Sequence, residues 1–441
     1  MKIHFIGIGG IGVSALARYF LKKEHKISGS DLAESEITKG LRELGVEIFI
    51  GPHSAKNIKD GIDSVIYSPA VKPNNPELKR AKKLQALSHK LQIKSYPEAL
   101  GELTKNHFTI AVSGTHGKST TTSMLGLLLV KAGLDPTVIV GTKVKEFGDS
   151  NCRVGKSKYL VIEADEHKVS FLNYWPKIVI LTNIEADHLD YYKNLGNIIK
   201  TFKKYVGHLP KDGVLVVNKE DRNIPKILKA LSCSILLYSL RQKEARVLKK
   251  IMKIPGEHNV LNALAVLTVA RTLNIPDKTS FKSLSEYRGS WRRFDVSKIL
   301  YPKPYTLISD YGHHPTEVRV TLDACREKYP SKRILCVFQP HQYQRTYYLF
   351  KDFIKVFKKA PIDKVIITDI YDVAGRETPE IKKKVSAEKL VKAINRKNVN
   401  YLQKEKIPAF LAENINRGDI LIVMGAGDIY NLSLNLKNRL K

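Results

Sequence analysis

Residues 109–124 read TIAVSGTHGKSTTTSM, a β-rich run followed by a glycine turn and a hydroxyl-rich helix start. The order of strand, glycines, Lys118, Ser119 and helix is typical of a P-loop, which binds nucleotide phosphates through its backbone N–H groups. In such loops the lysine reaches the outer phosphate oxygens and the adjacent hydroxyl serves Mg²⁺. Because position 112 is Val, the glycines stand at 114 and 117 rather than at the spacing G-x-x-x-x-G-K-[ST]. The alternative is a structural turn with an incidental lysine.

Metal-binding residue types follow the next two predicted strands. YLVIEADE places Glu163 at the end of a strand predicted over 159–163, and IVILTNIEADHLD places His188 just beyond a strand predicted over 178–182. Since ligands collect at the carboxyl ends of parallel strands, Ser119, Glu163 and His188 are expected to converge on Mg²⁺. Histidine is an uncommon Mg²⁺ ligand, so a packed or solvated His188 is the alternative.

A second glycine-rich loop opens the chain, which begins MKIHFIGIGGIGVSAL. Residues 7–12 read G-I-G-G-I-G after an apolar run, and Asp31 follows at the distance at which an acidic residue holds a ribose hydroxyl. The pattern responds to phosphate geometry, so NAD, FAD and nucleotide sugars all fit it. The alternative interpretation is a glycine-rich turn that binds no ligand.

Short apolar runs alternate with helical segments along almost the whole chain, which predicts parallel α/β sheets. Strands are predicted at 3–8, 64–67, 109–113, 159–163, 178–182, 214–218, 307–310, 334–338, 364–368 and 420–424. These are too many for one compact sheet, and ELTKNH at 102–107 and YRGSWRRF at 287–294 mark two boundaries. We therefore predict three α/β domains, over 1–105, 106–293 and 294–441.

The charge balance is strongly basic, with 74 Lys and Arg against 43 Asp and Glu and a formal net charge of +31. Such a field attracts polyanions, including nucleic acids, nucleotides and acidic sugars. The lysines are spread through helical surfaces instead of forming one arm, which favours a solvated basic surface over a specific nucleic-acid site.

Cysteine usage and hydropathy indicate a cytoplasmic protein. The four cysteines lie far apart without a C-x-x-C pair, so neither a zinc site nor a disulfide framework is indicated. The chain has no apolar run of the roughly 18 residues that a membrane-spanning helix needs. Its N-terminus lacks a signal-peptide pattern. We therefore expect no membrane insertion.

Two further segments carry candidate binding residues. IPGEHNVLNALAVLTVA presents His258 and Asn259 at the start of an apolar helix, where Asn259 as a helix cap is the structural alternative. SWRRF carries Arg292 and Arg293 at the second domain boundary. They are either a solvated pair or a phosphate clamp delivered by domain closure.

The segments HFIGIGGIG, SGTHGKSTTT, TNIEADHLD, HNVLNA, RRF, ISDYGHHPTEV, FQPHQYQRT and VMGAGDI together resemble the Mur ligase family of peptidoglycan synthesis. The resemblance covers essentially the whole chain. It implies a Rossmann-like N-terminal domain for a UDP-sugar, a central P-loop ATPase-type domain for ATP and Mg²⁺, and a C-terminal α/β domain that closes over them. It further implies that ATP phosphorylates the lactyl carboxylate of UDP-N-acetylmuramate and that the amine of L-alanine attacks the acyl phosphate, releasing ADP and phosphate.

The same resemblance implies roles for single residues. Lys118 is expected at the β- and γ-phosphates, His258 and Asn259 near the adenine, and Arg293 and Asp310 at the ATP from the domain junction. The expected ATP-binding set is Gly114, Thr115, His116, Gly117, Lys118, Ser119, Thr120, His258, Asn259 and Asp310. The expected UDP-sugar set is Gly9, Gly10, Ile11, Gly12, Asp31 and Ser68, and the metal set is Ser119, Glu163 and His188. The expected catalytic residues are Lys118, His188, Arg293, His341 and Arg345, the last two handling the amino acid or product carboxylate.

The chain departs from the family pattern at two places. EADEHK replaces the common EADESD, so that His167 and Lys168 stand for an acidic or polar pair, and Gln342 stands where many members carry Arg. One carboxylate anchor is thus missing or supplied elsewhere, which leaves the amino-acid preference open.

Three alternatives to the L-alanine ligase follow from the same observations. A relative that attaches a preformed tripeptide to the same sugar shares the resemblance. An NAD-dependent dehydrogenase fits the opening glycine loop but leaves the second loop without a purpose. A nucleic-acid-stimulated ATPase rests only on the net charge and the P-loop.

Overall fold

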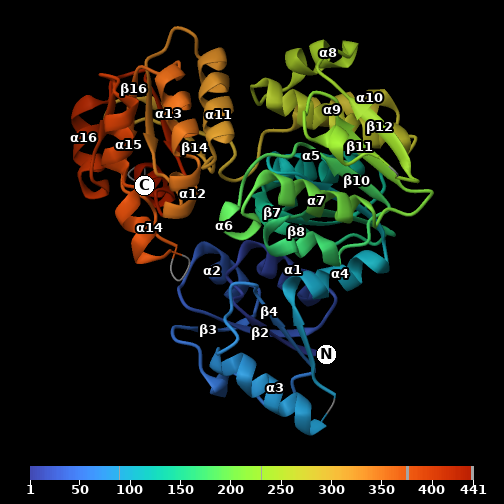
Figure 1. Cartoon of the computed structure of the whole chain (residues 1–441). Coiled ribbons are helices and arrows are strands. Elements are labelled where there is room, and N and C mark those ends of the chain that lie inside the picture. Colours follow the sequence, from blue (N-terminus) through green and yellow to red (C-terminus); the bar gives the residue numbers. More distant parts are fainter. Residues whose placement is uncertain (89, 230, 374–376, 439–441) are drawn as a thin grey trace. The chain divides into compact units, whose positions relative to one another are not determined.

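The computed structural model describes residues 1–88, 90–229, 231–373 and 377–438. These form three β-sheets with helices packed against them (Figure 1). The chain divides into two compact units, the first comprising Met1–Ile184, Lys200–Tyr238 and Leu264–Ser283, and the second Glu185–Ile199, Ser239–Ala263 and Leu284–Lys441. The first two sheets lie in the first unit and the third sheet lies in the second.

The N-terminal sheet is fully parallel, with the strand order β3-β2-β1-β4-β5. Its strands are β1 (Lys2–Ile6), β2 (Lys26–Asp31), β3 (Glu47–Ile50), β4 (Ser64–Tyr67) and β5 (Gln92–Ser95). Its helices are α1 (Ile11–Lys22), α2 (Glu36–Arg42), α3 (Pro76–Ser88) and α4 (Tyr96–Lys105). The strand order reverses between β1 and β4, and ligands of open α/β sheets bind at the carboxyl ends of such a switch point.

The central sheet has the order β12-β11-β10-β6-β9-β7-β8, with only the edge strand β8 antiparallel among its described pairs. Its strands are β6 (Phe108–Ser113), β7 (Thr137–Val144), β8 (Ser150–Arg153), β9 (Tyr159–Ala164), β10 (Ile178–Leu181), β11 (Val214–Asn218) and β12 (Ser234–Tyr238). The helices of this part of the chain are α5 (Lys118–Lys131), α6 (Leu189–Tyr192), α7 (Leu195–Val206), α8 (Lys243–Ile251), α9 (Glu257–Thr272) and α10 (Asp277–Glu286). Of these, α6 and α8 belong to the second unit, and α7, α9 and α10 are divided between the two units. Helix α5 directly follows the central strand β6 and is buried from Ser119 to Leu129, which anchors the glycine loop that precedes it.

The C-terminal sheet has the order β13-β14-β18-β15-β16-β17, parallel except for β13. Its strands are β13 (Asp295–Ile299), β14 (Tyr305–Asp310), β15 (Ile334–Phe338), β16 (Lys364–Ile367), β17 (Val399–Tyr401) and β18 (Ile420–Met424). Its helices are α11 (Pro315–Lys328), α12 (Tyr343–Tyr348), α13 (Phe350–Lys359), α14 (Pro379–Lys384), α15 (Ala387–Ile394), α16 (Ile407–Asn414) and α17 (Tyr430–Asn438). Alternate residues of the same strands belong to two apolar clusters, one including residues of α11, α13 and α15 and the other residues of α16, as expected for a sheet buried on both faces.

The α/β prediction is confirmed, and each of the ten predicted strands is present with ends that differ by at most two residues. The sequence reading missed the interior strands β2 and β7 and the edge strands β3, β5, β8, β12, β13 and β17. The edge strands are short or partly exposed, and so lack the continuous apolar run of a buried parallel strand. The three sheets fall within 1–105, 106–293 and 294–441, while the exact domain boundaries stay a prediction.

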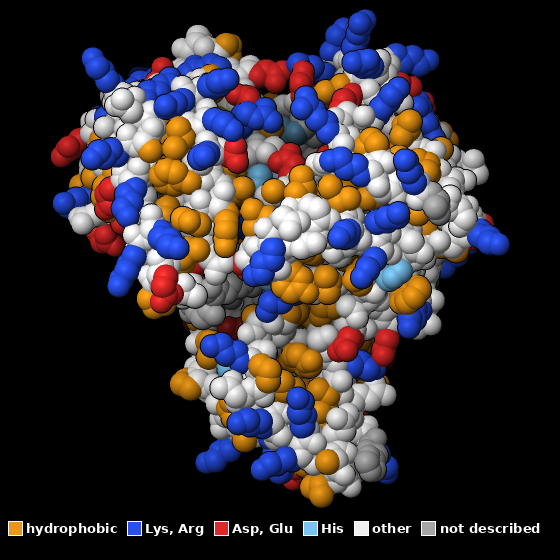
Figure 2. Space-filling model, in the orientation of Figure 1, with side chains coloured by type: hydrophobic (Ala, Val, Ile, Leu, Met, Phe, Trp, Pro, Cys, Tyr) orange, Lys and Arg blue, Asp and Glu red, His pale blue; other side chains and the backbone are white. Residues whose placement is uncertain are grey.

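Charged side chains are distributed over the visible face of the molecule, with Lys and Arg scattered among other residue types (Figure 2). Within the described residues, none of the helices combines the length and the apolar character that crossing a bilayer requires. All four cysteines are unpaired, and three of them are buried.

Candidate functional site

The P-loop requires glycine at two positions. Gly114 has a φ of +129°, and a Cβ there would collide with the Thr182 hydroxyl. Gly117 lies in the left-handed region at the N-cap of α5, with no side-chain cap. The loop between them is fixed by Asn183, whose carbonyl and side-chain oxygens accept the N–H groups of Thr115 and His116 at 3.0 and 2.9 Å. Because glycine has no side chain to cap it, the N-terminus of α5 keeps its backbone N–H groups available for a phosphate group.

Lys118 folds back onto its own loop and a buried acid. Its Nζ donates to the Gly114 carbonyl at 2.8 Å and pairs with Glu166 Oε2 at 2.8 Å. Burial raises the pKa of Glu166. Burial by itself lowers the pKa of Lys118, but the neighbouring carboxylates, with Glu166 foremost, raise it overall. The lysine is therefore held charged at the start of α5. Sequence reasoning did not single out Glu166, although it lies in the EADE segment.

Two of the three predicted metal ligands lie together in the first unit. Ser119 Oγ donates to Glu163 Oε1 at 3.1 Å, and the Gly141 N–H donates to Glu163 Oε2 at 2.8 Å. A hydroxyl and a carboxylate are hard oxygen donors of the kind that Mg²⁺ prefers, so these two residues fit the ion. His188 belongs to the second unit, where it adopts a φ of +51° at the N-cap of α6.

The opening glycine loop, Asp31 and Ser68 meet at the switch point of the N-terminal sheet. The Gly9 N–H donates to Asp31 Oδ2 at 2.8 Å, and a Cβ on Gly7 would come within 3.0 Å of Ser68 Cβ. Helix α1 starts at Ile11 behind Gly10, again without a side-chain cap. A Cβ on Gly12 would approach the Tyr96 ring to 2.9 Å. The predicted UDP-sugar residues thus form one contiguous loop region at a helix N-terminus.

The EADEHK departure lies beside this loop. Lys168 and Val169 both have positive φ values, of 49° and 55°, which are uncommon for residues other than glycine. Lys168 Nζ donates to the carbonyl oxygen of Pro69, next to Ser68, at 3.3 Å. The substitution therefore brings a cation to the edge of the N-terminal loop region.

His258 and Asn259 lie in the first turn of α9. Asn259 Nδ2 donates to the Pro255 carbonyl at 2.6 Å, so the alternative of Asn259 as a helix N-cap is wrong, because a cap accepts from a backbone N–H. Burial lowers the pKa of His258 to about 4, which leaves the ring neutral. An adjoining pocket of about 270 Å³ is lined by Lys249, Met252, Lys253, Ile254, Pro255, Gly256, Val260, Glu327 and Lys328.

The two arginines of SWRRF have different environments. Arg292 is buried, donates to the Gly425 carbonyl and lies over the rings of Tyr311 and Tyr430 at 4.8 and 4.6 Å. The interpretation of a solvated pair is therefore wrong for Arg292. Arg293 is half-buried, with its guanidinium 4.9 Å from the Tyr311 ring.

Asp310 accepts the backbone N–H groups of Phe294 and Gly312, both at 2.8 Å. Burial raises the pKa of this carboxyl group. Its visible role is to tie the segment after β14 to the start of β13.

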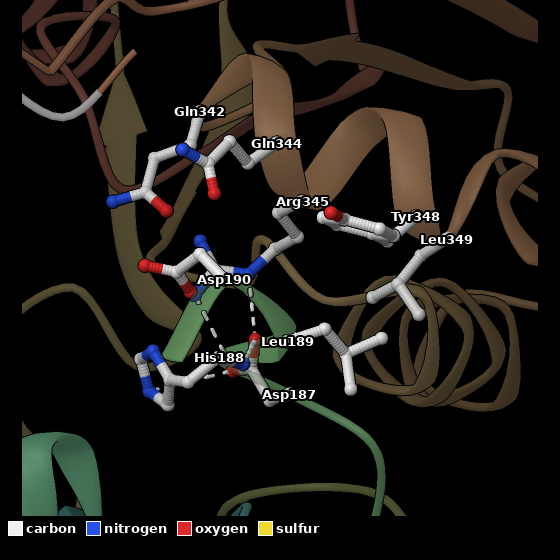
Figure 3. A pocket seen from close by; sticks show the side chains of 9 residues that line it. All are labelled: Asp187, His188, Leu189, Asp190, Gln342, Gln344, Arg345, Tyr348 and Leu349. Atoms are coloured by element: carbon white, nitrogen blue, oxygen red, sulfur yellow. Dashed lines mark hydrogen bonds and ion pairs between the residues drawn. The ribbon is translucent and has the colours of Figure 1, made fainter. Parts of the chain in front are cut away.

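His341 and Arg345 lie side by side on and just before α12. Arg345 NH1 donates to His341 Nδ1 at 3.2 Å, and the His341 ring stacks on Tyr371 with centroids 5.5 Å apart. The other edge of the guanidinium meets the carboxylate of Asp187 (Figure 3). Sequence reasoning missed Asp187, although it directly precedes His188 in TNIEADHLD. Gln342 has a φ of +73°, and its backbone N–H donates to the Tyr371 carbonyl.

Comparison with known proteins gives a consistent result over the three domains. Residues 2–108 match the domain described as "Mur ligase family, catalytic domain", residues 112–253 the "Mur ligase middle domain", and residues 292–427 the "Mur ligase, glutamate ligase domain". The UDP-N-acetylmuramate--L-alanine ligase of Clostridium tetani is 42% identical to this chain, covering 97% of it and 96% of the relative. The ligase of the same name from Clostridium novyi is 38% identical, covering 98% and 96%.

Solved structures agree with these relatives. The crystal structure of the UDP-N-acetylmuramate-alanine ligase from Thermotoga maritima has a TM-score of 0.81 at 28% identity and covers 100% of this chain and 99% of its own. A murein peptide ligase from Psychrobacter arcticus, at 22% identity and a TM-score of 0.71, shares the fold. The chain belongs to the Mur ligase family. Within that family, it resembles the UDP-N-acetylmuramate--L-alanine ligases over nearly its whole length.

Proposed function

We propose that this protein is an ADP-forming ligase that joins L-alanine to the lactyl carboxylate of UDP-N-acetylmuramate in peptidoglycan precursor synthesis. The observation that carries the proposal is the 42% identity to a UDP-N-acetylmuramate--L-alanine ligase over 97% of the chain. The family membership also favours the ligase over the dehydrogenase, because a Mur ligase uses two nucleotide substrates and the chain has two glycine-rich loops, at 7–12 and 114–117. One loop takes the UDP diphosphate and the other takes ATP. With both nucleotides as substrates, we place the reaction in the cytoplasm.

The chemistry requires that a carboxylate, which is a poor acyl donor, first becomes an acyl phosphate. Lys118 and the N–H groups at the start of α5 would stabilise the phosphoryl group during its transfer from ATP to the lactyl carboxylate. Ser119 and Glu163, with His188, would hold Mg²⁺, which neutralises phosphate charge when bound. The amine of L-alanine then attacks the acyl carbon, the C–O bond to phosphate breaks, and the amine loses a proton as the amide forms.

Nucleotide use is supported by a related solved structure, the MurF ligase from Thermotoga maritima in complex with ADP, which shares this fold at a TM-score of 0.61. In this chain, His258, Asn259 and the adjoining pocket of α8 and α9 would accept the adenine. The neutral state of His258 suits a contact with an uncharged base. Arg293 and Asp310 would approach the ATP from the start of the C-terminal domain.

The test is phosphate release by the purified protein with Mg²⁺-ATP and UDP-N-acetylmuramate, on addition of L-alanine, L-serine, glycine or the murein tripeptide. We expect turnover with L-alanine as the preferred acceptor. Release of phosphate with none of these acceptors would refute the ligase. A clear preference for the tripeptide would instead assign the chain to peptide recycling, and Gln342 makes the comparison among free amino acids informative.

A further inference from the structure

Asp187 and Arg345 form a buried two-point ion pair within the second unit. Arg345 Nε donates to Asp187 Oδ1 at 3.0 Å and NH2 donates to Oδ2 at 3.3 Å, with 8% of each residue's surface exposed (Figure 3). Two parallel hydrogen bonds between a planar guanidinium and a carboxylate fix the orientation of the guanidinium plane. Asp187 therefore determines where the remaining nitrogen of Arg345 is directed.

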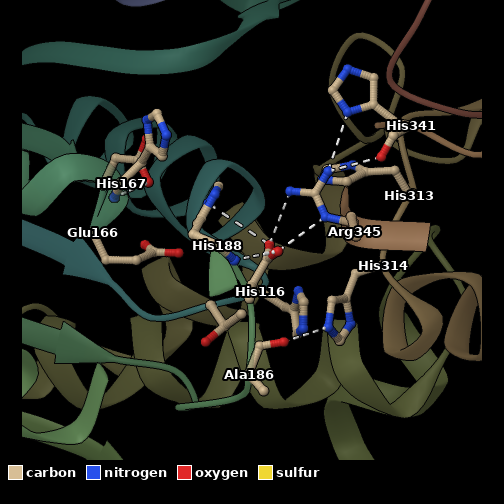
Figure 4. Close-up of polar contacts among 12 residues, drawn as sticks. His116, Glu166, His167, Ala186, His188, His313, His314, His341 and Arg345 are labelled. Carbon is tan, nitrogen blue, oxygen red and sulfur yellow. Dashed lines mark hydrogen bonds and ion pairs between the residues drawn. The ribbon is translucent and has the colours of Figure 1, made fainter. Parts of the chain in front are cut away.

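That remaining nitrogen, NH1, is directed at His341. It donates to His341 Nδ1 at 3.2 Å and to the His341 carbonyl at 3.3 Å (Figure 4). Arginine has no acceptor, so Nδ1 must accept, and the proton of the neutral imidazole must be on Nε2. The arginine thus selects one tautomer of His341, while stacking on Tyr371 holds the ring plane.

Asp187 is itself held firmly. The His188 N–H donates to Asp187 Oδ1 at 2.7 Å, and the left-handed backbone of His188 turns the chain there into α6. On the preceding residue, the Ala186 carbonyl accepts from His314 Nε2 at 3.1 Å. One residue earlier again, Glu185 accepts from the Thr316 hydroxyl. These contacts of Glu185, Ala186 and His188 restrict the backbone around Asp187 and keep its carboxylate next to Arg345.

We propose that Asp187 is a positioning residue that orients Arg345 and, through it, the Nε2–H tautomer of His341 for the incoming amino acid. The proposal rests on the proposed function, because only the family resemblance places His341 and Arg345 at the amino acid. In this role Asp187 acts on the amino acid through Arg345. Because Gln342 stands where many family members carry an arginine, His341 and Arg345 are the two groups left to handle the carboxylate of the amino acid. Both depend on Asp187 for their orientation.

The first test is Asp187→Asn in the full chain, assayed by phosphate release. An asparagine offers one oxygen to the guanidinium and turns an N–H toward the other donor, so one hydrogen bond and the charge are lost. We expect kcat/KM for L-alanine to fall about 10- to 100-fold, mainly through KM. The KM values for ATP and UDP-N-acetylmuramate and the Mg²⁺ dependence stay within about twofold. Asp187→Glu, which keeps the charge, recovers part of the loss.

The matched control is Asp277→Asn. Asp277 forms an equally direct two-point pair with Arg271, at 3.0 and 2.8 Å, but on the surface. We expect its kinetic constants to equal those of the unmodified protein. A change in Asp187→Asn confined to Mg²⁺ dependence would overturn the proposal, because it would show that Asp187 acts through the adjacent His188. Unchanged kinetics for L-alanine would overturn it as well.

A second variant keeps the proposal testable if Asp187→Asn does not fold. Arg345→Lys retains a cation beside Asp187 but cannot reach both the carboxylate and His341 Nδ1 with a planar fork. Nitrogen NMR of labelled histidine is expected to show His341 as the Nε2–H tautomer in the unmodified protein and as a mixture in Arg345→Lys. The same tautomer in both would refute the inference. Absence of any ligation by the unmodified protein would refute the proposed function instead, so the two failures are distinguishable.

Discussion

Glu77 is a fully buried carboxylate at the start of α3, and its removal is expected to destabilise the N-terminal sheet. Oε2 accepts from Ser30 at 2.6 Å and from His4 at 3.2 Å, and Oε1 accepts from Asn57 at 2.7 Å and from His53 at 3.0 Å. Burial by itself raises the pKa of Glu77, but these hydrogen bonds, with that of His4 foremost, lower it overall to about 2. Four donors from β1, β2 and the segment after β3 thus depend on one charge.

The magnitude follows from the shift in pKa. A fall from 4.5 to about 2 corresponds to about 3 kcal/mol of stability for the ionised form, at about 1.4 kcal/mol per unit. Because the pKa is lower in the folded state, the contribution is complete above about pH 5 and is lost as the pH falls toward 2. Glu77→Gln keeps the volume but turns an N–H toward two donors, so we expect a loss of about 2–3 kcal/mol at pH 7.

The assay is thermal and urea unfolding of the full chain at pH 7 and pH 4, with hydrogen exchange of β1 and β2 to localise the effect. At pH 7, we expect the variant to unfold at a lower temperature and a lower urea concentration than the unmodified protein. We also expect its stability to change less between pH 7 and pH 4. Glu102→Gln is the control, since Glu102 is exposed and its carboxylate pairs with Lys94 on the surface at 2.7 Å. An equal pH dependence in Glu77→Gln and the unmodified protein would refute the reasoning.

Three further predictions concern the central domain. Lys118→Ala is expected to lower ligation at least 100-fold while UDP-N-acetylmuramate binding, measured by calorimetry, stays intact; wild-type turnover would contradict the P-loop assignment. Gly114→Ala is expected to abolish ATP binding or to destabilise the domain by about 2 kcal/mol or more, because its φ and the Thr182 hydroxyl exclude a Cβ; unchanged ATP titration and melting would refute this. Removal of Mg²⁺ by EDTA is expected to stop phosphate release reversibly, and Glu163→Gln to raise the Mg²⁺ concentration needed for half-maximal rate about tenfold or more; an unaltered Mg²⁺ titration would exclude Glu163 as a ligand.

Much of the site could be predicted because its signals are local in the chain. The P-loop joins a buried strand to a helix within a few residues, and its glycines, lysine and hydroxyl must follow one another for backbone reasons alone. The same holds for the G-I-G-G-I-G loop between β1 and α1. Buried parallel strands such as β10, β15 and β18 were also predictable, since each is a continuous apolar run, whereas the interior strands β2 and β7 were missed.

The partners of these local motifs were decided only by the tertiary structure. Glu166 beside Lys118, Asp187 beside Arg345 and the four donors around Glu77 join residues far apart in the chain. Their proximity depends on strand order and on how helices pack against each sheet, which no local pattern encodes. The sequence by itself therefore determined which phosphate-binding loops the protein has and the family to which they point. The packing of distant segments decided which charged partners these functional residues have, such as Glu166 for Lys118 and Asp187 for Arg345. Burial and charge pairing exist only once the sheets have formed.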